Sequence, residues 1–520
     1  MDSNRPAGSL FPQNVVPSDD ELPPGFRAFL EPLHRRFTPW QRFIIESRRR
    51  ALEASWNGAP PDYATTVRAD VVKNSEWSIA VPDWMADQRN QMTGPADDAE
   101  LCVKMLNSGA PGVMIDLEDS MANTWECTKR GVANAIKALH GELTYAGKKG
   151  ETVAIKPSAT VTFTRVRGLH MSQHGVYGET VSASVFDAAL LVFGVDPAKL
   201  RHPLCLYIPK SESAEEARWW GEFLKALALA KGLPADAIKC MALVESHPLA
   251  YQVEEFLFEL REHILGLNLG RWDYMASLIH FTLHDPKWVL PDRNTIPHDV
   301  PFFQKLRTHL VEICHKRGAL AIGGMTALYP SRTDAPLNAR ALAVLEKDKK
   351  NEAAVGMDGA WTGHPDQNAV AVAQFPRPNQ IGFRPSDAEP SPDLRPLPAG
   401  VGVATIEGTR AAARTTIRYR AGVLAGRGAS LLDGYMEDLA TDRIYRLMIA
   451  QRVRHALEVY DDLGAATVHT PDFVRGVYRE ELARIIAALG LDPESSEARL
   501  YENAARISLA MIEAGEFDPS

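Results

Sequence analysis

Short apolar runs alternate with helix-period segments over most of the chain. The runs are Trp77–Val81, Gly112–Leu117, Val153–Pro157, Thr160–Val166, Pro203–Pro209, Ile238–Val244, Ile264–Leu269, Ala319–Gly323 and Gly359–Gly363. Short β-like runs separated by helical patterns are typical of parallel α/β folds. About eight such units within roughly 300 residues predict a (β/α)₈ TIM barrel, and a doubly wound open sheet is the alternative.

Charged side chains stand at the ends of several of these runs. Asp116 and Arg165 lie in the second and fourth runs, while Lys210, Glu245 and Asp273 follow later ones. The carboxyl ends of parallel strands meet on one face, where ligands bind. The pattern therefore predicts a polar pocket containing cations at one mouth of the barrel.

The stretch from Met241 to Asp273 reads as strand, helix, strand, with Glu245 and Asp273 at the two strand ends. Two carboxylates brought together in this way repel each other unless a cation lies between them. A hard divalent ion such as Mg²⁺, completed by water and substrate oxygens, fits this supply of ligands. The alternative is that both acids only cap helices.

The ends of the chain have a different character. Residues 1–25 are rich in Pro, Asp and Ser, which indicates a poorly ordered lead-in, and a helix is expected from Phe26 to about Trp56. The basic run Arg48–Arg50 is interpreted as a solvated flank of that helix. Residues 374–400 hold seven prolines and form a stiff linker. Beyond it we expect a helical bundle, with helices at Thr409–Leu424, Asp438–Leu457, Pro471–Leu489 and Ala498–Ala514.

The predicted organisation has four parts. Residues 1–76 form the lead-in and an N-terminal helical clasp, and residues 77–375 form the TIM barrel. Residues 376–400 are the Pro-rich linker, and residues 401–520 are a C-terminal helical plug.

The composition of the chain argues against several classes of function. A hydrophobic content of 45% and a charged content of 24% describe an ordinary globular protein. The formal net charge of -9 argues against a nucleic-acid partner. Five scattered cysteines without metal-binding spacing indicate reduced thiols and a cytoplasmic protein. We expect neither a signal peptide nor a membrane span.

Seven motifs, in order along the chain, resemble the malate synthase family in its shorter, A-type form. They are VMIDLEDSMANTW (113–125), VRGLH (166–170), MALVES (241–246), GLNLGRWDYMASLI (266–279), IGGMTALYP (322–330), MDGAWTGHP (357–365) and YMEDLATDRI (435–444). The resemblance covers residues from about 70 to 450. The family fold that it implies, a TIM barrel with an N-terminal clasp and a C-terminal plug, agrees with the patterning.

The resemblance implies an acyltransferase of the glyoxylate cycle. Such an enzyme condenses acetyl-CoA with glyoxylate and hydrolyses the thioester to malate and CoA, with Mg²⁺ as cofactor. Its partners would be these small molecules, with no nucleic acid and no membrane, and the protein would be a monomer or a small homo-oligomer.

The motifs also imply roles for single residues. Glu245 and Asp273 match the metal ligands, Arg165 the catalytic arginine that stabilises the enolate, and Asp438 the catalytic base. Arg167 is the alternative to Arg165. Residues that resemble those holding the metal's water ligands are Asp116 and Glu118. The resemblance further implies substrate contacts at Gly270, Arg271 and Trp272, and acetyl-CoA contacts at Met325, Asp358, Trp361 and Pro365.

The sequence departs from the family pattern at Met357, Leu269, Gly363 and Leu169. None of these positions supplies a catalytic group, but together they leave the acyl-CoA and keto-acid preference open. The alternatives are a related acyl-CoA/2-keto acid synthase, a malyl-CoA-type lyase, or a non-catalytic relative. The C-terminal MED motif favours a synthase over a lyase, and the presence of Arg165, Glu245, Asp273 and Asp438 argues against a non-catalytic protein.

Overall fold

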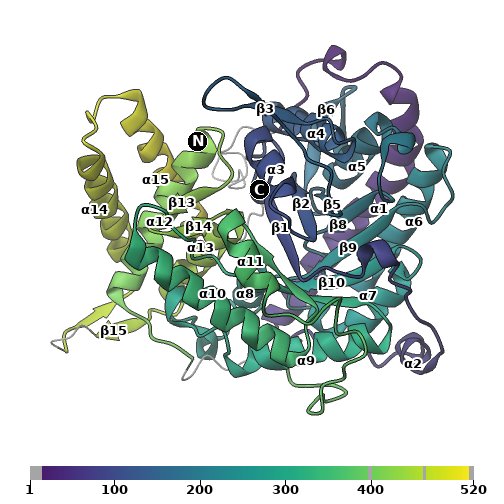
Figure 1. Cartoon of the computed structure of the whole chain (residues 1–520). Helices are drawn as coiled ribbons and strands as arrows, with labels where there is room; N and C mark the ends of the chain where they lie inside the picture. Colours follow the sequence, from purple (N-terminus) through teal and green to yellow (C-terminus); the bar gives the residue numbers. More distant parts are fainter. Residues whose placement is uncertain (1–13, 396–400, 461–463, 515–520) are drawn as a thin grey trace.

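The computed structural model describes residues 14–395, 401–460 and 464–514. Eight parallel strands close into a barrel in the order β1-β2-β5-β8-β9-β10-β11-β12 (Figure 1). This confirms the predicted TIM barrel and excludes the open sheet. The barrel strands are β1 (Asn90–Pro95), β2 (Gly112–Asp116), β5 (Val161–Arg165), β8 (Cys205–Ile208), β9 (Lys239–Val244), β10 (Ile264–Leu269), β11 (Leu320–Met325) and β12 (Gly359–Thr362).

Seven of these strands coincide with predicted apolar runs, but the first does not. The run Trp77–Val81 is not a strand, and β1 occupies Asn90–Pro95 instead. The prediction was wrong because β1 carries polar residues that face the barrel interior. Gln91, for example, is fully buried, and its Oε1 accepts hydrogen bonds from Tyr207 Oη (2.8 Å) and Trp361 Nε1 (3.0 Å).

The run Val153–Pro157 was also wrongly placed in the barrel. It contains β4 (Thr152–Ala154), which pairs with β3 (Thr144–Ala146) in a separate hairpin. A second hairpin joins β6 (Ser172–Val176) and β7 (Glu179–Ser182). The helices that surround the barrel are α3 (Ala99–Leu106), α4 (Trp125–Leu139), α5 (Ala183–Gly194), α6 (Ala214–Ala230), α7 (Val253–Leu260), α8 (Arg271–Phe281), α9 (Pro301–Lys316), α10 (Ala335–Val355) and α11 (Asn368–Val372).

The N-terminal helix α1 (Phe26–Trp56) lies along the outside of the barrel, beside α5 and α6 and away from α14 and α15 (Figure 1). Its apolar face packs through aromatic contacts such as Phe37 against Trp219. A short helix, α2 (Val67–Asn74), follows. The expected disorder of the lead-in falls partly on residues 1–13, which lie outside the described residues. From Asn14 the chain lies against the barrel domain, where the Val16 amide donates to the His174 carbonyl (2.9 Å).

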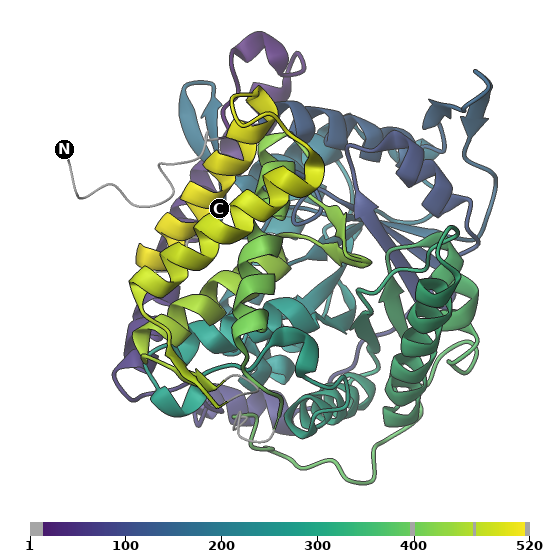
Figure 2. The same ribbon diagram turned by 90° about the vertical axis from the view of Figure 1, so that its left-hand side faces the viewer.

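The C-terminal region is helical, as expected. Its helices are α12 (Ile406–Leu424), α13 (Leu439–Arg454), α14 (Pro471–Leu489) and α15 (Ser496–Ala514), with the small hairpins β13 (Ser430–Leu432)/β14 (Tyr435–Glu437) and β15 (Glu458–Tyr460)/β16 (Ala466–Val468). Figure 2 shows these helices stacked in front of the barrel strands. Helix α13 packs against α8, which begins directly after β10. The C-terminal region therefore meets the barrel at the carboxyl ends of its strands.

The described part of the predicted linker, residues 376–395, contains no helix or strand. It is nevertheless fixed to the rest of the protein, since Leu394 is buried and Tyr63 Oη donates to the Pro392 carbonyl (2.9 Å). Among the described residues, the search for a helix with the length and hydropathy needed to cross a lipid bilayer finds none.

Candidate active site

A cavity of about 230 Å³ opens at the carboxyl ends of the barrel strands. Its walls come from both parts of the protein, because barrel residues and the β14–α13 segment contribute together. The predicted site residues in its lining are Asp116, Arg165, Glu245, Gly270, Arg271, Trp272, Asp273, Met325, Trp361 and Asp438. The polar pocket predicted from the strand ends is therefore present.

A buried ion pair joins the first two strand ends of the site. The register of β2 and β5 sets Asp116 opposite Arg165. Arg165 Nε and Nη2 donate to the two carboxylate oxygens of Asp116, each at 2.6 Å. Two parallel hydrogen bonds of this kind fix the orientation of the guanidinium plane and the position of its charge. The remaining nitrogen, Nη1, lies 3.7 Å from Glu118 and 3.6 Å from Asp119.

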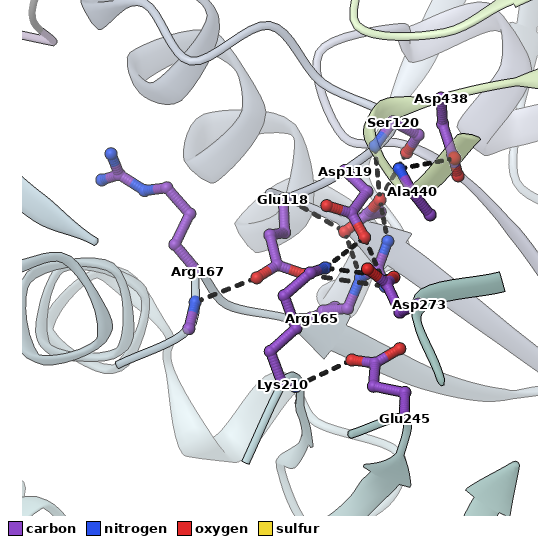
Figure 3. Close-up of polar contacts among 12 residues, drawn as sticks. Glu118, Asp119, Ser120, Arg165, Arg167, Lys210, Glu245, Asp273, Asp438 and Ala440 are labelled. Atoms are coloured by element: carbon purple, nitrogen blue, oxygen red, sulfur yellow. Dashed lines mark hydrogen bonds and ion pairs between the residues drawn. The ribbon is translucent and has the colours of Figure 1, made fainter. Parts of the chain in front are cut away.

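Lys210 carries a second positive charge into the cluster (Figure 3). Its ammonium contacts Glu118 Oε2 (3.0 Å), Asp119 and Asp273 Oδ2 (3.4 Å). Its backbone adopts φ of 47°, in the left-handed region that non-glycine residues rarely enter. In this conformation the Lys210 amide donates to Glu245 Oε1 (2.7 Å). Strained backbone of this kind is typical of functional sites.

The N-terminal helix supports Lys210 from outside. Arg48 Nη2 donates to the Lys210 carbonyl (2.7 Å), and Arg48 Nε donates to Glu216 (2.9 Å). Arg48 was interpreted as part of a solvated flank, and this was wrong, because its side chain is only 14% exposed, whereas that of Arg49 is 56% exposed.

The two predicted metal ligands follow neighbouring strands of the barrel. Glu245 follows β9 directly, and Asp273 lies in the first turn of α8, after β10. Gly270, between β10 and α8, lies close to Glu245, because a Cβ at this position would come within 2.6 Å of Glu245 Oε2. Asp273 is also bound from the C-terminal region, since Arg443 Nη1 on α13 donates to Asp273 Oδ1 (2.6 Å).

The donor set fits a hard divalent cation. Glu245, Asp273 and Asp119 present carboxylate oxygens to one cavity, and Asp119 Oδ1 is buried without a hydrogen-bond partner. Within residues 14–395, 401–460 and 464–514, no group of three or more His, Cys, Asp or Glu side chains is arranged to hold a metal. Two protein carboxylates with water and substrate oxygens in the other positions are, however, the usual arrangement for Mg²⁺.

Burial and mutual repulsion govern the protonation of the cluster. Burial raises the pKa of Glu245 well above its usual value, and repulsion from Asp273 adds to the effect. Burial likewise raises the pKa of Asp273, and that of Glu118 to about 7. For Asp116, burial acts in the same direction, but the Arg165 charge outweighs it and holds the pKa below its usual value. The cluster therefore favours binding of additional positive charge, either protons or a metal ion.

Asp438 reaches the cavity from the C-terminal region. It is the N-cap of α13, where its Oδ1 accepts a hydrogen bond from the Ala440 amide (3.1 Å). The neighbouring Glu437 is held by Arg293, whose Nη1 and Nη2 donate to its two oxygens at 3.0 and 2.9 Å. Burial raises the pKa of Asp438 to about 7, and repulsion from Asp119 and Asp273 contributes. Of the two adjacent acids, Asp438 is the one that lines the cavity and can accept a proton near neutral pH.

Arg167 differs from Arg165 in its surroundings. Its Nε and Nη2 donate to Asp187 at 2.9 and 2.6 Å, and further bonds reach Asn123 and Gln173. Figure 3 shows its side chain directed away from the carboxylate cluster. All of these contacts are structural, so the geometry favours Arg165 for catalysis.

The predicted substrate and acetyl-CoA contacts divide into two groups. Arg271 and Trp272 line the cavity with Met325 and Trp361, and the Arg271 guanidinium donates to the Ile296 and Pro297 carbonyls. The structure does not bring Asp358 or Pro365 to the cavity. Asp358 is fully buried, and its carboxylate accepts hydrogen bonds from the Ala321 and Gln380 amides.

Three residues of the site had no role assigned from the sequence: Asp119, Lys210 and Arg443. Asp119 stands next to Glu118, and Lys210 ends an apolar run, so both carried a signal in the sequence. Arg443 carried none, because its approach to Asp273 depends on how α13 packs against α8.

Comparisons with known proteins identify relatives along most of the chain. The family model described as "Malate synthase, TIM barrel domain" matches residues 161–393, and "Malate synthase, C-terminal" matches residues 403–520. Malate synthase A of Escherichia coli (strain K12) is 34% identical over 490 residues, which cover 92% of this chain and 90% of that protein. Malate synthase of Streptomyces clavuligerus is 36% identical over 509 residues, which cover 94% and 92%.

Among solved structures, a ternary complex of Haloferax volcanii malate synthase with pyruvate and acetyl-CoA has a TM-score of 0.49 and 15% sequence identity. The matched region covers 83% of this chain and 98% of the Haloferax volcanii chain.

The contrast between the two arginines can be tested by conservative replacement. Arg165→Lys keeps the charge but loses the two parallel hydrogen bonds to Asp116, so we expect turnover of acetyl-CoA with glyoxylate to fall by about 100-fold or more, with the protein still folded. Arg167→Lys breaks a buried network, so we expect a loss of about 3 kcal/mol of stability and nearly unchanged turnover per folded molecule. Thermal unfolding and steady-state kinetics on both variants check this. A larger loss of turnover in Arg167→Lys than in Arg165→Lys would contradict the assignment.

Proposed function

The chain belongs to the malate synthase family, and we propose that its condensation of acetyl-CoA with glyoxylate takes place in the cavity between the barrel mouth and the β14–α13 segment. One observation carries the proposal. Asp438, a carboxyl group with a pKa near 7, lines the same cavity as Arg165, Glu245 and Asp273 although it comes from the C-terminal region.

The difficult step of the reaction is removal of a proton from the acetyl methyl group, a weak carbon acid. In the proposal, the Asp438 carboxylate accepts this proton. A carboxylate of ordinary pKa is a weak base near neutrality, whereas one with a pKa near 7 combines a useful population of the charged form with greater basicity. The hydrogen bond from the Ala440 amide orients the carboxylate.

Arg165 stabilises the negative charge that appears on the thioester oxygen as the proton leaves. Asp116 holds its guanidinium through Nε and Nη2, which leaves Nη1 as the nitrogen available to a reacting oxygen. A donor fixed before the reaction starts stabilises the transition state without reorganisation at that moment. Attack of the enolate on the aldehyde carbon forms the new carbon–carbon bond, and water then cleaves the thioester to release CoA.

The proposed cofactor is Mg²⁺, held by Glu245 and Asp273. When bound, the ion supplies Lewis-acid polarisation of the glyoxylate aldehyde and orients that substrate. Asp119 and Asp116, which line the cavity, and the neighbouring Glu118 would help to orient water bound to the metal. Gly270 and the amides at the start of α8 leave room for the glyoxylate carboxylate near Arg271 and Trp272. Met325 and Trp361 line the side of the cavity from which the acetyl group enters. Asp358 and Pro365 do not line the cavity.

We further propose a cytoplasmic location, in keeping with five buried and unpaired cysteines. The oligomeric state that fits the proposal is a monomer or a small homo-oligomer, because the described residues of one chain supply every proposed catalytic group.

Replacement of Asp438 tests the proposed base directly. The wild-type protein with Mg²⁺, glyoxylate and acetyl-CoA should release free thiol, and Asp438→Asn should lower kcat by about 10²–10⁴-fold. Glu437→Gln serves as the neighbouring control, since it weakens the ion pair to Arg293 without touching the cavity. Thiol release by Asp438→Asn at the wild-type rate would contradict the proposal, and so would release that requires a different acyl-CoA or keto acid.

The pH dependence follows from the raised pKa of Asp438. The carboxyl group must be deprotonated to act, so the rate should fall as the pH drops through its pKa. That value is about 7 without metal, and a divalent cation nearby lowers it, so the acidic limb of kcat/KM should have its midpoint at or below pH 7. Rates measured between pH 5 and 9 check this prediction. An acidic limb centred above about pH 8 would contradict it.

The metal site can be tested without turnover. A methyl group at position 270 would come within 2.6 Å of Glu245 Oε2. We therefore expect Gly270→Ala to weaken Mg²⁺ binding at least about tenfold in calorimetric titrations without substrates. Gly382→Ala is the matched control, since a Cβ there meets no atom within 4 Å. Equal Mg²⁺ affinity of Gly270→Ala and the control would rule out the proposed role of Gly270.

A further inference from the structure

Helix α10 carries a buried ion pair that the proposed chemistry does not use. Lys349 Nζ lies 3.1 Å from Glu352 Oε2, and both side chains are at most 1% exposed. On the same helix, the pair Lys350–Glu346 is largely exposed, as is usual for a helical Lys–Glu pair. Burying two charges is costly unless further hydrogen bonds compensate. The surroundings of Lys349 and Glu352 therefore indicate what the pair does.

The pair binds both backbone groups of Gly324, near the end of β11. Lys349 Nζ donates to the Gly324 carbonyl (2.6 Å), and the Gly324 amide donates to Glu352 Oε1 (3.1 Å). The preceding residue is also a glycine, and a Cβ on Gly323 would come within 2.3 Å of the Glu352 carboxyl group. The close approach of the pair to this strand thus depends on Gly323.

The β11 strand is irregular at this point. Its register with β12 shifts between Ile322 and Met325, so the two glycines lie in a break of the regular ladder. Strand pairing resumes only at Met325, opposite Trp361. Between these two points the Lys349–Glu352 pair supplies contacts to the backbone of Gly324.

The segment that follows Gly324 is hydrogen-bonded to the hairpin that precedes the proposed base. Met325 and Tyr329 line the cavity. Between them, the Ala327 carbonyl accepts a hydrogen bond from the Met436 amide, and the Tyr329 amide donates to the Gly434 carbonyl, both at 2.9 Å. These bonds tie the segment to β14, which ends one residue before Asp438.

We propose that Lys349 and Glu352 are positioning residues for the catalytic base. By fixing Gly324, they set the course of residues 325–329, and the backbone bonds of that segment to β14 then set the position of Asp438 over the barrel mouth. The inference rests on the proposed function, because it takes Asp438 as the group that removes the acetyl proton. A small displacement of a catalytic group far from the altered residue is enough to cost a large factor in rate.

The experiment compares Lys349→Met and Glu352→Gln with Lys350→Met in the full-length protein. Lys350→Met is the matched control, since it removes a lysine one position away whose ion pair is exposed. The measurements are thermal unfolding, kcat, KM for glyoxylate, and the kinetic isotope effect with acetyl-CoA deuterated at the methyl group. The isotope effect reports proton removal, which a purely stabilising role would not change.

We expect Lys349→Met and Glu352→Gln to lower kcat about tenfold or more, with KM for glyoxylate changed less than about threefold. The isotope effect should exceed that of the wild type, because proton removal becomes slower relative to other steps. Lys350→Met should behave as the wild type. Gly323→Ala places a methyl group against the Glu352 carboxyl group and should give the same fall in kcat and the same rise in isotope effect. This variant replaces Lys349→Met in the test if Lys349→Met does not fold.

Wild-type kcat and isotope effect in folded Glu352→Gln and Gly323→Ala would overturn the proposal. A loss of rate that follows only the folded fraction, with a wild-type isotope effect, would also overturn it. Asp438→Asn, measured in parallel, separates the two levels of inference. If Asp438→Asn is active, the assignment of the base fails, and this proposal fails with it. If it is inactive while the α10 variants behave as the wild type, only the positioning role is wrong.

Discussion

Repulsion between buried carboxyl groups is the constraint on which the rest of this site depends. Asp116, Glu118, Asp119, Glu245, Asp273 and Asp438 converge at the carboxyl ends of the barrel strands, and the cations that face them are Arg165, Lys210 and Arg443. Such a group of acids, with little access to water, is unfavourable by itself. The three cations offset part of this cost, and in the proposed function a bound metal ion would offset more of it.

The same cluster of charges spans the barrel and the C-terminal region. Asp273 belongs to the barrel, but Arg443 from α13 binds one of its oxygens, and Asp119 and Asp273 help to raise the pKa of Asp438 at the start of that helix. The packing of α13 on α8 therefore brings Arg443 to Asp273 and places the proposed base at the start of the same helix. The barrel alone holds the proposed metal ligands but lacks the proposed base.

Much of this arrangement could be predicted from the sequence. Seven barrel strands followed from apolar runs, and Glu245 and Asp273 followed from their places at strand ends. Strand β1 was missed because its interior side chains, such as Gln91, are polar and find partners only across the barrel. Asp438 could be singled out from Glu437 only by resemblance, since the ion pair between Glu437 and Arg293 spans 144 residues of sequence. Arg443 and the Lys349–Glu352 pair depend on tertiary packing in the same way, and no local pattern marks them.

The central claim is that the carboxyl cluster holds protons near neutral pH that a divalent cation displaces. Calorimetric titration with Mg²⁺ in two buffers of different ionisation enthalpy measures this proton release directly. Burial and mutual repulsion raise the pKa values of Glu245 and Asp273, and those of Glu118 and Asp438 to about 7. We therefore expect Mg²⁺ binding to release protons at pH 7, and fewer at pH 9. Mg²⁺ binding without proton release at pH 7, or no binding at all, would contradict the account.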